Sequence, residues 1–341
     1  MKNILFYTRV LSLLLLLSAL PASVALAAAE APEELVQFTP HDRLFSVAFS
    51  GEFGQAVGEA GLILQSTDGG KSWRRETSPP TKASLFSVAT IGRRSIAVGQ
   101  QGLILVREGR KQWRQVAAIT NERLLRVSMN DAGLAIATGA FGTLLKSTDY
   151  GETWTAIKPD WVSMYATETV SDFAAVRDEP TLYAVKVFRD GSIVIGGEYG
   201  QINRSTDGGE TWVPVFNASA DGATPPTFFG MNFNDEGTGF AVGQEGLVAM
   251  SNDYGQTWRQ LDAGSSANLF DVEVTRNGQV VAIGMRSCLV SADAGNSWQP
   301  LRALDTSLNW YSGLAQSSSA PGNSIFAVGH SGRVVKLLAG N

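Results

Sequence analysis

Cysteine and histidine are scarce in this sequence. Among 341 residues, Cys288 is the only cysteine, and His41 and His330 are the only histidines. A single cysteine can form neither an intramolecular disulfide nor a cysteine-based zinc site. The two histidines are isolated, and the sequence contains no nucleophile elbow, no metal-ligand pair and no phosphate-binding loop. We therefore expect a protein that is not an enzyme and that uses no metal and no cofactor.

An excess of basic residues is also missing. Lysine and arginine number 27 against 32 aspartates and glutamates, so the formal net charge is −5. A chain with this balance lacks the basic surface that non-specific nucleic-acid binding requires. We expect no nucleic acid among its partners.

Long hydrophobic runs are confined to the N-terminus. Basic residues flank the start of an apolar run at residues 10–20, and Ala25-Leu26-Ala27 offers a cleavage site of the small-x-small type. This order is typical of a secretory signal peptide. We expect residues 1–27 to be removed, which places residues 28–341 in the periplasm or outside the cell. The alternative is a retained membrane anchor, for which the run is short against the roughly 20 residues of a spanning helix.

Helical periodicity is absent from the rest of the chain, and an eight-residue motif recurs instead. The motif reads Ser-x-Asp-x-Gly-x-Thr/Ser-Trp, and we call each copy an octet. Its aspartate can accept hydrogen bonds from nearby backbone N–H groups, its glycine supplies a positive φ, and its tryptophan buries a ring against the next strand. The octets therefore predict hairpin turns, with aspartates that serve folding rather than a substrate. The five octets are residues 66–73, 147–154, 205–212, 251–258 and 291–298, and residues 106–113 form a degenerate sixth copy.

Each octet belongs to a larger repeating unit. A unit opens with a short apolar strand, continues with a second strand that ends in a Gly-x-x-Gly turn, and adds a third strand that leads into the octet. The tryptophans lie about forty to sixty residues apart, which is the spacing of four-stranded propeller blades. Short β-branched and aromatic runs separated by glycine turns indicate an all-β protein. The seven opening strands are expected at 44–49, 85–90, 124–129, 182–187, 228–233, 269–274 and 311–316.

The seventh unit has only three strands, and a spare strand is available at the other end of the chain. Residues 311–316, 324–329 and 333–338 supply the three, while residues 35–39 precede the first unit without a partner. Pairing residues 35–39 with 333–338 would close the ring and remove an exposed sheet edge. The sequence therefore predicts a seven-bladed β-propeller whose N-terminal strand closes the last blade.

These motifs resemble known families. The octet resembles the Asp-box, or BNR, repeat of β-propellers. Units of the form Leu-Phe-x-Val, Ala-Val-Gly-x-x-Gly-x-Ile and Ser-x-Asp-Gly-Gly-x-x-Trp resemble the photosystem II stability and assembly factor family over nearly the whole mature chain. The resemblance implies a seven-bladed propeller that helps to assemble a membrane complex and binds its partner through a patch of arginines.

Strand direction alternates in a four-stranded meander, so the blade ends divide into two faces. The Gly-x-x-Gly turns and the loops between blades share one, here called the turn face, and the octets lie on the other, the octet face. The middle residues of the turns mix acids, amides and aromatics, a composition that suits partner binding. The alternative is that they are ordinary solvated turn residues. The candidate partner-binding residues on these turns are Glu59, Gln100, Glu198, Tyr199, Gln244 and His330.

One long insertion, residues 155–181, separates the third and fourth blades and is expected on the turn face. A long loop in a compact repeat protein is usually functional or disordered, and aromatic residues argue against disorder. Trp161, Tyr165 and Arg177 are therefore further candidates for partner binding. The alternative is a lid packed over the third and fourth blades.

Four charged residues fall on the opening strands, which line the propeller axis: Arg126, Lys186, Asp271 and Glu273. Charges among close-packed strands need partners or water. Arg126 and Lys186 are candidates for binding an acidic segment of a partner. Mutual pairing without any ligand is the alternative.

The sequence as a whole favours an exported, non-catalytic scaffold or assembly factor, expected as a monomer. It would bind a membrane-protein client or another envelope partner through one propeller face. The alternative is a glycan-binding or sialidase-like propeller, since sialidases carry the same octets and aromatic side chains can stack on sugars. A sialidase needs paired catalytic groups and convergent arginines, and no Phe-Arg-Ile-Pro-like segment precedes the first octet.

Overall fold

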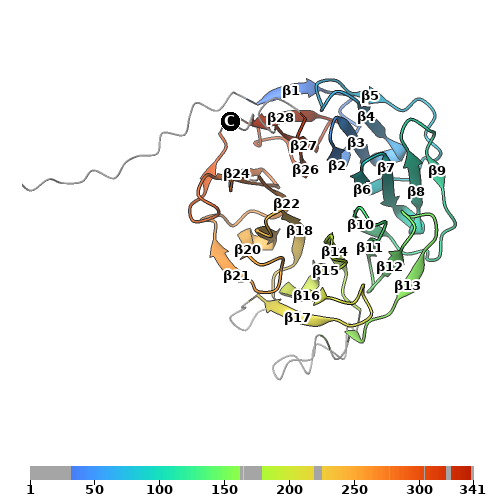
Figure 1. The fold of residues 1–341 in the computed structure, drawn as a ribbon. Coiled ribbons are helices and arrows are strands. Elements are labelled where there is room, and N and C mark those ends of the chain that lie inside the picture. Colours follow the sequence, from blue (N-terminus) through green and yellow to red (C-terminus); the bar gives the residue numbers. More distant parts are fainter. Residues whose placement is uncertain are drawn as a thin grey trace, which may run out of the picture.

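The computed structural model describes residues 32–161, 164, 179–218, 225–275, 277–302, 304–319 and 324–338. These residues form seven four-stranded antiparallel sheets arranged as blades around a central axis (Figure 1). The predicted all-β, seven-bladed propeller is therefore confirmed. The proposed signal peptide and most of the insertion, with Tyr165 and Arg177, lie outside the described residues.

The innermost strand of each blade surrounds the axis and begins with a fully buried apolar residue. Five of the seven have the predicted bounds, and the other two extend one residue further. The inner strands are β2 (Leu44–Ser50), β6 (Leu85–Ile91), β10 (Leu124–Met129), β14 (Leu182–Val187), β18 (Phe228–Phe233), β22 (Leu269–Val274) and β26 (Tyr311–Gln316).

The second and third strands form the core of each blade. Both faces of these strands pack against neighbouring blades, so they are short, almost continuously buried runs instead of alternating ones. The second strands are β3 (Phe53–Gly58), β7 (Arg94–Gly99), β11 (Ala135–Gly139), β15 (Ile193–Gly197), β19 (Gly239–Gly243), β23 (Val280–Gly284) and β27 (Ile325–Gly329). The third strands are β4 (Ile63–Ser66), β8 (Ile104–Glu108), β12 (Leu144–Ser147), β16 (Gln201–Ser205), β20 (Leu247–Ser251), β24 (Ser287–Ser291) and β28 (Val334–Leu338).

The outer strands are short and begin one residue after the tryptophan of each octet, because the indole itself is turned inward against the blade. In the first six blades they are β5 (Arg74–Arg75), β9 (Arg114–Gln115), β13 (Thr155–Ile157), β17 (Val213–Asn217), β21 (Arg259–Asp262) and β25 (Gln299–Pro300).

The outer strand of the seventh blade is β1 (Glu33–Val36), which pairs with β28 from the other end of the chain (Figure 1). The predicted closure of the ring is therefore confirmed, but the strand begins two residues and ends three residues earlier than the expected 35–39. It ends before Thr39 because the Thr39 N–H donates to the Asp42 carboxylate at 3.0 Å and turns the chain. Phe38 still contacts the blade, since its N–H donates to the carbonyl of Ser331 at 3.1 Å.

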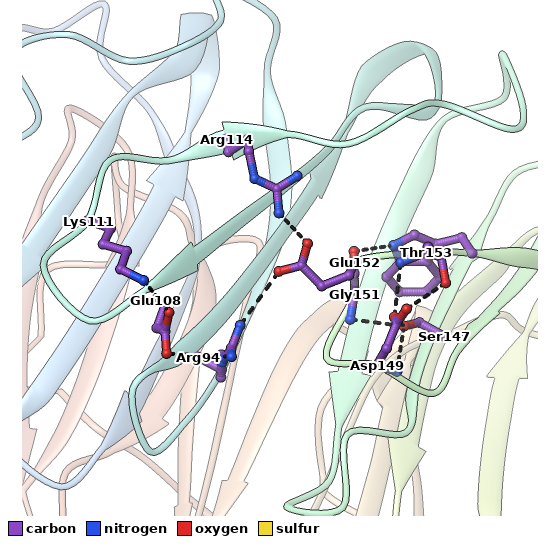
Figure 2. A network of polar contacts seen from close by, with 10 residues as sticks. Arg94, Glu108, Lys111, Arg114, Ser147, Asp149, Gly151, Glu152 and Thr153 are labelled. Carbon is purple, nitrogen blue, oxygen red and sulfur yellow. Dashed lines mark hydrogen bonds and ion pairs between the residues drawn. The ribbon is translucent and has the colours of Figure 1, made fainter.

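The octets form the predicted hydrogen-bonded turns. In the third blade, Asp149 accepts from the Ser147 hydroxyl at 2.7 Å, and from the Thr153 N–H at 2.9 Å and hydroxyl at 2.6 Å (Figure 2). The Ser147 hydroxyl in turn accepts from the N–H of Gly151. Burial alone would raise the pKa of Asp149, but the hydrogen bonds from Thr153 and Ser147 outweigh it and lower that pKa below its ordinary value.

The degenerate octet of the second blade has ion pairs in place of this turn network. Glu108 contacts Lys111 at 2.6 Å and Arg94 at 3.5 Å. Glu152, from the octet of the third blade, pairs with both Arg94 and Arg114 of the second blade (Figure 2). The octet of the third blade thus stabilises its own turn through Asp149 and pairs with the second blade through Glu152.

Candidate functional site

The turn face is built as the meander predicts. The second glycine of each intact Gly-x-x-Gly turn lies against the loop that leads to the next blade. The N–H of Gly102 donates to the carbonyl of Glu122 at 2.8 Å, and that of Gly246 donates to Ala267 at 2.9 Å. Four of these turns contain a single 3₁₀ turn: Glu59–Gly61, Gln100–Gly102, Glu198–Gly200 and Gln244–Gly246.

In four of the turns the first middle residue has a largely internal role. The side chains of Gln100, Glu198 and Gln244 accept hydrogen bonds from backbone N–H groups that directly precede the inner strands of their own blades, at 2.8–3.0 Å. Glu59 pairs with Arg43 at 2.5 Å. These four predicted partner-binding side chains therefore hold the turn to its blade, and a role in binding stays a prediction.

The second middle residue of each turn has left-handed backbone geometry in all seven blades. The residues are Ala60, Gln101, Phe141, Tyr199, Glu245, Arg286 and Ser331, with φ between 52° and 64°. This conformation is uncommon for residues other than glycine. Phe141 is 64% exposed here, and Tyr199 is half-buried.

His330 lies between two elements of the seventh blade. Its Nδ1 is 3.2 Å from Asn309 Oδ1 and 3.0 Å from Ser331 Oγ. Its ring meets the indole of Trp310 at 6.2 Å between centroids. The side chain of His330, a predicted site residue, therefore contacts residues of its own blade.

Trp161 is 7% exposed and packs with Ile136, Leu144 and Leu182 in a core cluster between the third and fourth blades. This position agrees with the alternative in which the start of the insertion packs on the blades. Its buried ring leaves little surface for stacking on a ligand.

Large apolar side chains are exposed mainly on the turn face. Six are exposed within the described residues, and Val213 and Tyr254 lie away from this face. The other four occupy Gly-x-x-Gly turns or loops between blades: Ile119, Phe141, Met285 and Leu308, the last of which is 82% exposed.

The second residue of each inner strand stands at a β-bulge. In the first blade Leu44 pairs with Gly58 and Ser46 with Val57, so Phe45 is an extra residue in the ladder. The same register shift recurs at the same place in all seven blades. Bulges of this kind redirect a side chain and bend the strand.

Five of the seven bulged residues are aromatic, and the seventh blade has Ser312 at this position. The bulged residues of the first six blades lie at the turn-face ends of the inner strands, and with Trp310, which precedes the seventh inner strand, we call them the aromatic collar: Phe45, Phe86, Leu125, Tyr183, Phe229, Phe270 and Trp310. All are half-buried. Ring centroids lie 5.7 Å apart for Phe45 and Phe86, 5.3 Å for Tyr183 and Phe229, 5.9 Å for Phe229 and Phe270, and 6.2 Å for Phe45 and Trp310.

A polar channel of about 300 Å³ lies along the inner strands and is lined from their third or fourth residue onward, after the collar positions. Arg126 and Asp271 form an ion pair at this level, and the second Asp271 oxygen accepts from the Leu314 N–H at 2.9 Å. The predicted mutual pairing therefore applies to Arg126. Lys186 lies deeper, where the channel meets a wider cavity of about 750 Å³ that opens toward the octet face.

Glu273 lies beside Lys186 in the channel and is 7% exposed. One of its carboxylate oxygens accepts from the Asn232 amide at 3.2 Å. Burial, together with the charge of Asp271, raises the pKa of Glu273 to about 8 despite Lys186 and Arg126. The folded protein therefore holds a proton that the unfolded chain releases near pH 4.5.

This proton makes stability depend on pH. The Glu273 contribution is complete below the unfolded pKa and is lost as the pH rises through the folded pKa, so the melting temperature should fall between about pH 5 and about pH 8. Glu273→Gln, which stays neutral, should flatten this fall. Glu245→Gln on the turn face is the matched control. A pH series of thermal melts with equal slopes for Glu273→Gln and the unmodified protein would contradict the assignment.

No three His, Cys, Asp or Glu side chains in the described ranges are grouped as a metal ion would require. No helix in that part of the chain is long and apolar enough to cross a membrane.

Fold and site together define the class of this protein: a seven-bladed β-propeller with an apolar turn face around a polar channel. No family model matches the sequence. Over 224 residues the chain is 24% identical to "Photosystem II assembly lipoprotein Ycf48" from Synechococcus sp. (strain CC9902). The match covers 63% of this chain and 61% of that protein, less than two thirds of the relative's length. The chain is thus similar to a photosystem II assembly protein, as its motifs indicated.

Solved structures agree on the fold. "YCF48 bound to D1 peptide" superposes with a TM-score of 0.68 at 18% identity, over 91% of this chain and 96% of that one. "YCF48 from Cyanidioschyzon merolae" gives 0.68 at 16% identity, over 90% and 98%. "Streptogramin B lyase structure" gives 0.69 at 12% identity, over 89% and 96%. At these identities the likeness shows the fold alone.

Proposed function

We propose that this chain is an exported, non-catalytic scaffold or assembly factor that binds a membrane-protein client, or another envelope partner, through its turn face. Similarity to a photosystem II assembly lipoprotein supports the role in assembly, and a YCF48 structure with a D1 peptide supports a polypeptide partner. The N-terminal apolar run supports export.

The observation that carries the proposal is the distribution of exposed apolar side chains. Four of the six large ones within the described residues lie on the turn face, around the half-buried aromatic collar. Exposed apolar side chains that gather on one face of a folded protein are a common mark of an interaction site. Here they come from two parts of the ring, the second to third blades and the sixth to seventh. The octet face, by comparison, is occupied in five blades by intact octets whose aspartate accepts hydrogen bonds from its own octet.

Glycan binding and sialidase-like hydrolysis are the alternative. The predicted stacking platform would have included Trp161, which is buried in the core. The likeness to streptogramin B lyase concerns the fold and does not extend to a site.

The test compares capture of membrane proteins by purified variants. The triple variant Phe141→Gln, Met285→Gln and Leu308→Gln removes exposed apolar groups from the turn face. The control variant Val213→Gln and Tyr254→Gln removes similar groups elsewhere. Immobilised proteins are incubated with detergent-solubilised envelope membranes of the source organism, and retained membrane proteins are identified by mass spectrometry.

We expect the triple variant to lose the clients that the unmodified protein and the control both retain, with unchanged melting temperatures. Equal capture by all three proteins would contradict use of the turn face. Release of sugar from sialosides by the purified chain would contradict a non-catalytic role.

A further inference from the structure

The aromatic collar carries no charge at any of its positions, although the inner-strand residues that follow it line a polar channel. A charged group that entered it would lose hydration against uncharged rings, and the two charged side chains that act on Tyr183, Glu198 and Arg123, are of opposite sign. At the next level inward, Arg126 is already paired with Asp271, and Asp271 also accepts a backbone N–H. The mouth of the channel therefore suits an uncharged group.

The orientation of the collar rings bears on whether the site would bind an apolar side chain or a sugar. Stacking on a sugar requires an open ring face. Phe45 and Trp310 lie nearly parallel, at 11° with centroids 6.2 Å apart, an offset arrangement that covers only part of each face, and Phe229 meets Tyr183 edge to face at 86°. What these contacts leave exposed around the axis is a set of ring edges and partial faces, which pack well against aliphatic or aromatic groups.

The space behind the collar limits the size of what can enter. A cavity of about 300 Å³ lies at the lower end of the range for ligand pockets. It has room for a side chain, not for a folded element. Exposed Phe141, Met285 and Leu308 stand on the same face and offer further apolar contacts to chain that runs outward from the axis.

We propose that the aromatic collar is the docking site for an extended segment of the client polypeptide, which inserts one uncharged apolar side chain, of the size of Leu or Phe, into the mouth of the channel. This inference rests on the proposed function, because it takes the client to be a polypeptide bound at the turn face. The bulges of the first six blades are the structural basis of the site, since each redirects its collar residue at the turn-face end of the inner strand, while Trp310 joins the collar from the loop before the seventh inner strand.

Binding of defined peptides tests the proposal. The probes are fluorescently labelled Gly-Ser peptides that carry Leu, Phe, Lys or Glu at their central positions, with chitotriose as the sugar probe. Anisotropy titration measures the peptides and calorimetry the sugar. We expect the Leu and Phe peptides to bind best. The variant Phe86→Gln and Phe229→Gln should weaken them at least about tenfold, or about 1.4 kcal/mol, while Val213→Gln and Tyr254→Gln should leave them unchanged.

A second variant tests the proposal by a change of preference, which an unfolded protein could not show. Leu125→Glu adds one carboxylate to the half-buried collar and should shift preference from the Leu peptide to the Lys peptide. The proposal is overturned if no peptide binds, if Lys or Glu peptides or chitotriose bind the unmodified protein best, or if folded collar variants bind as the unmodified protein does. Client capture that depends on Phe141, Met285 and Leu308 but not on the collar would leave the proposed function intact and remove only this inference.

Discussion

Removal of residues 32–38 is expected to open the ring and make the protein aggregate. These residues supply β1, whose pairing with β28 completes the seventh blade. Leu35, Val36 and Phe38 pack against the core cluster shared by the first and seventh blades, and each partly buried side chain contributes up to about 1.5–3 kcal/mol. Without them, β28 becomes an exposed sheet edge of the kind that pairs with other chains.

Light scattering and thermal melting measure this effect. A chain that begins at Pro32 is the matched control, because it retains β1 and should behave as the longer protein. A monomeric product with an unchanged melting temperature after removal of residues 32–38 would show that β1 is dispensable for closure.

Asp149→Ala is expected to cost about 1.5–3 kcal/mol of folding free energy, because it removes a carboxylate that accepts three hydrogen bonds. The Thr153 N–H and hydroxyl lose their acceptor. The Ser147 hydroxyl loses the partner that orients it toward the Gly151 N–H.

Glu108→Ala in the degenerate octet is the comparison. Glu108 makes exposed contacts with Lys111 and Arg94, and surface ion pairs of this kind contribute little (Figure 2). Urea denaturation of both variants gives the two losses. Equal losses would mean that the degenerate octet stabilises its turn as strongly as an intact one.

The architecture could be predicted because its signals are local and repeated. Each inner strand is a short apolar run, and each octet contains its own hydrogen-bond donors and acceptors. Closure of the ring followed from counting strands, since the three strands of the seventh unit needed a fourth. The predicted end of β1 was wrong by three residues because Phe38 looks like strand but follows the end of the ladder.

The aromatic collar was not predicted, although the Leu-Phe pair that contains three of its residues recurs in the sequence. Regular alternation assigns successive strand residues to opposite faces, so Phe45 would point away from Ser46. A bulge breaks that alternation, and no residue type at the position announces it. An aromatic residue at the second position of five of the seven inner strands was the available signal.

The sequence also could not show which predicted site side chains are hydrogen-bonded or buried within the fold. Gln100, Glu198 and Gln244 look like free polar groups in a turn, and only the fold shows that backbone N–H groups of their own blades occupy them. Trp161 looked like an exposed aromatic in a long loop, yet the groove between the third and fourth blades buries it.

The left-handed residues of the seven turns have a consequence for how this surface can change. Glycine would relieve a backbone cost of roughly 1–2 kcal/mol at each position, yet none of the seven is glycine. Ser331 is buried and Tyr199 half-buried, but the other five, Ala60, Gln101, Phe141, Glu245 and Arg286, are exposed on the turn face. Substitutions at these five positions would alter surface chemistry without repacking the blades, so the propeller has one exposed, substitutable position on the turn face in each of five blades.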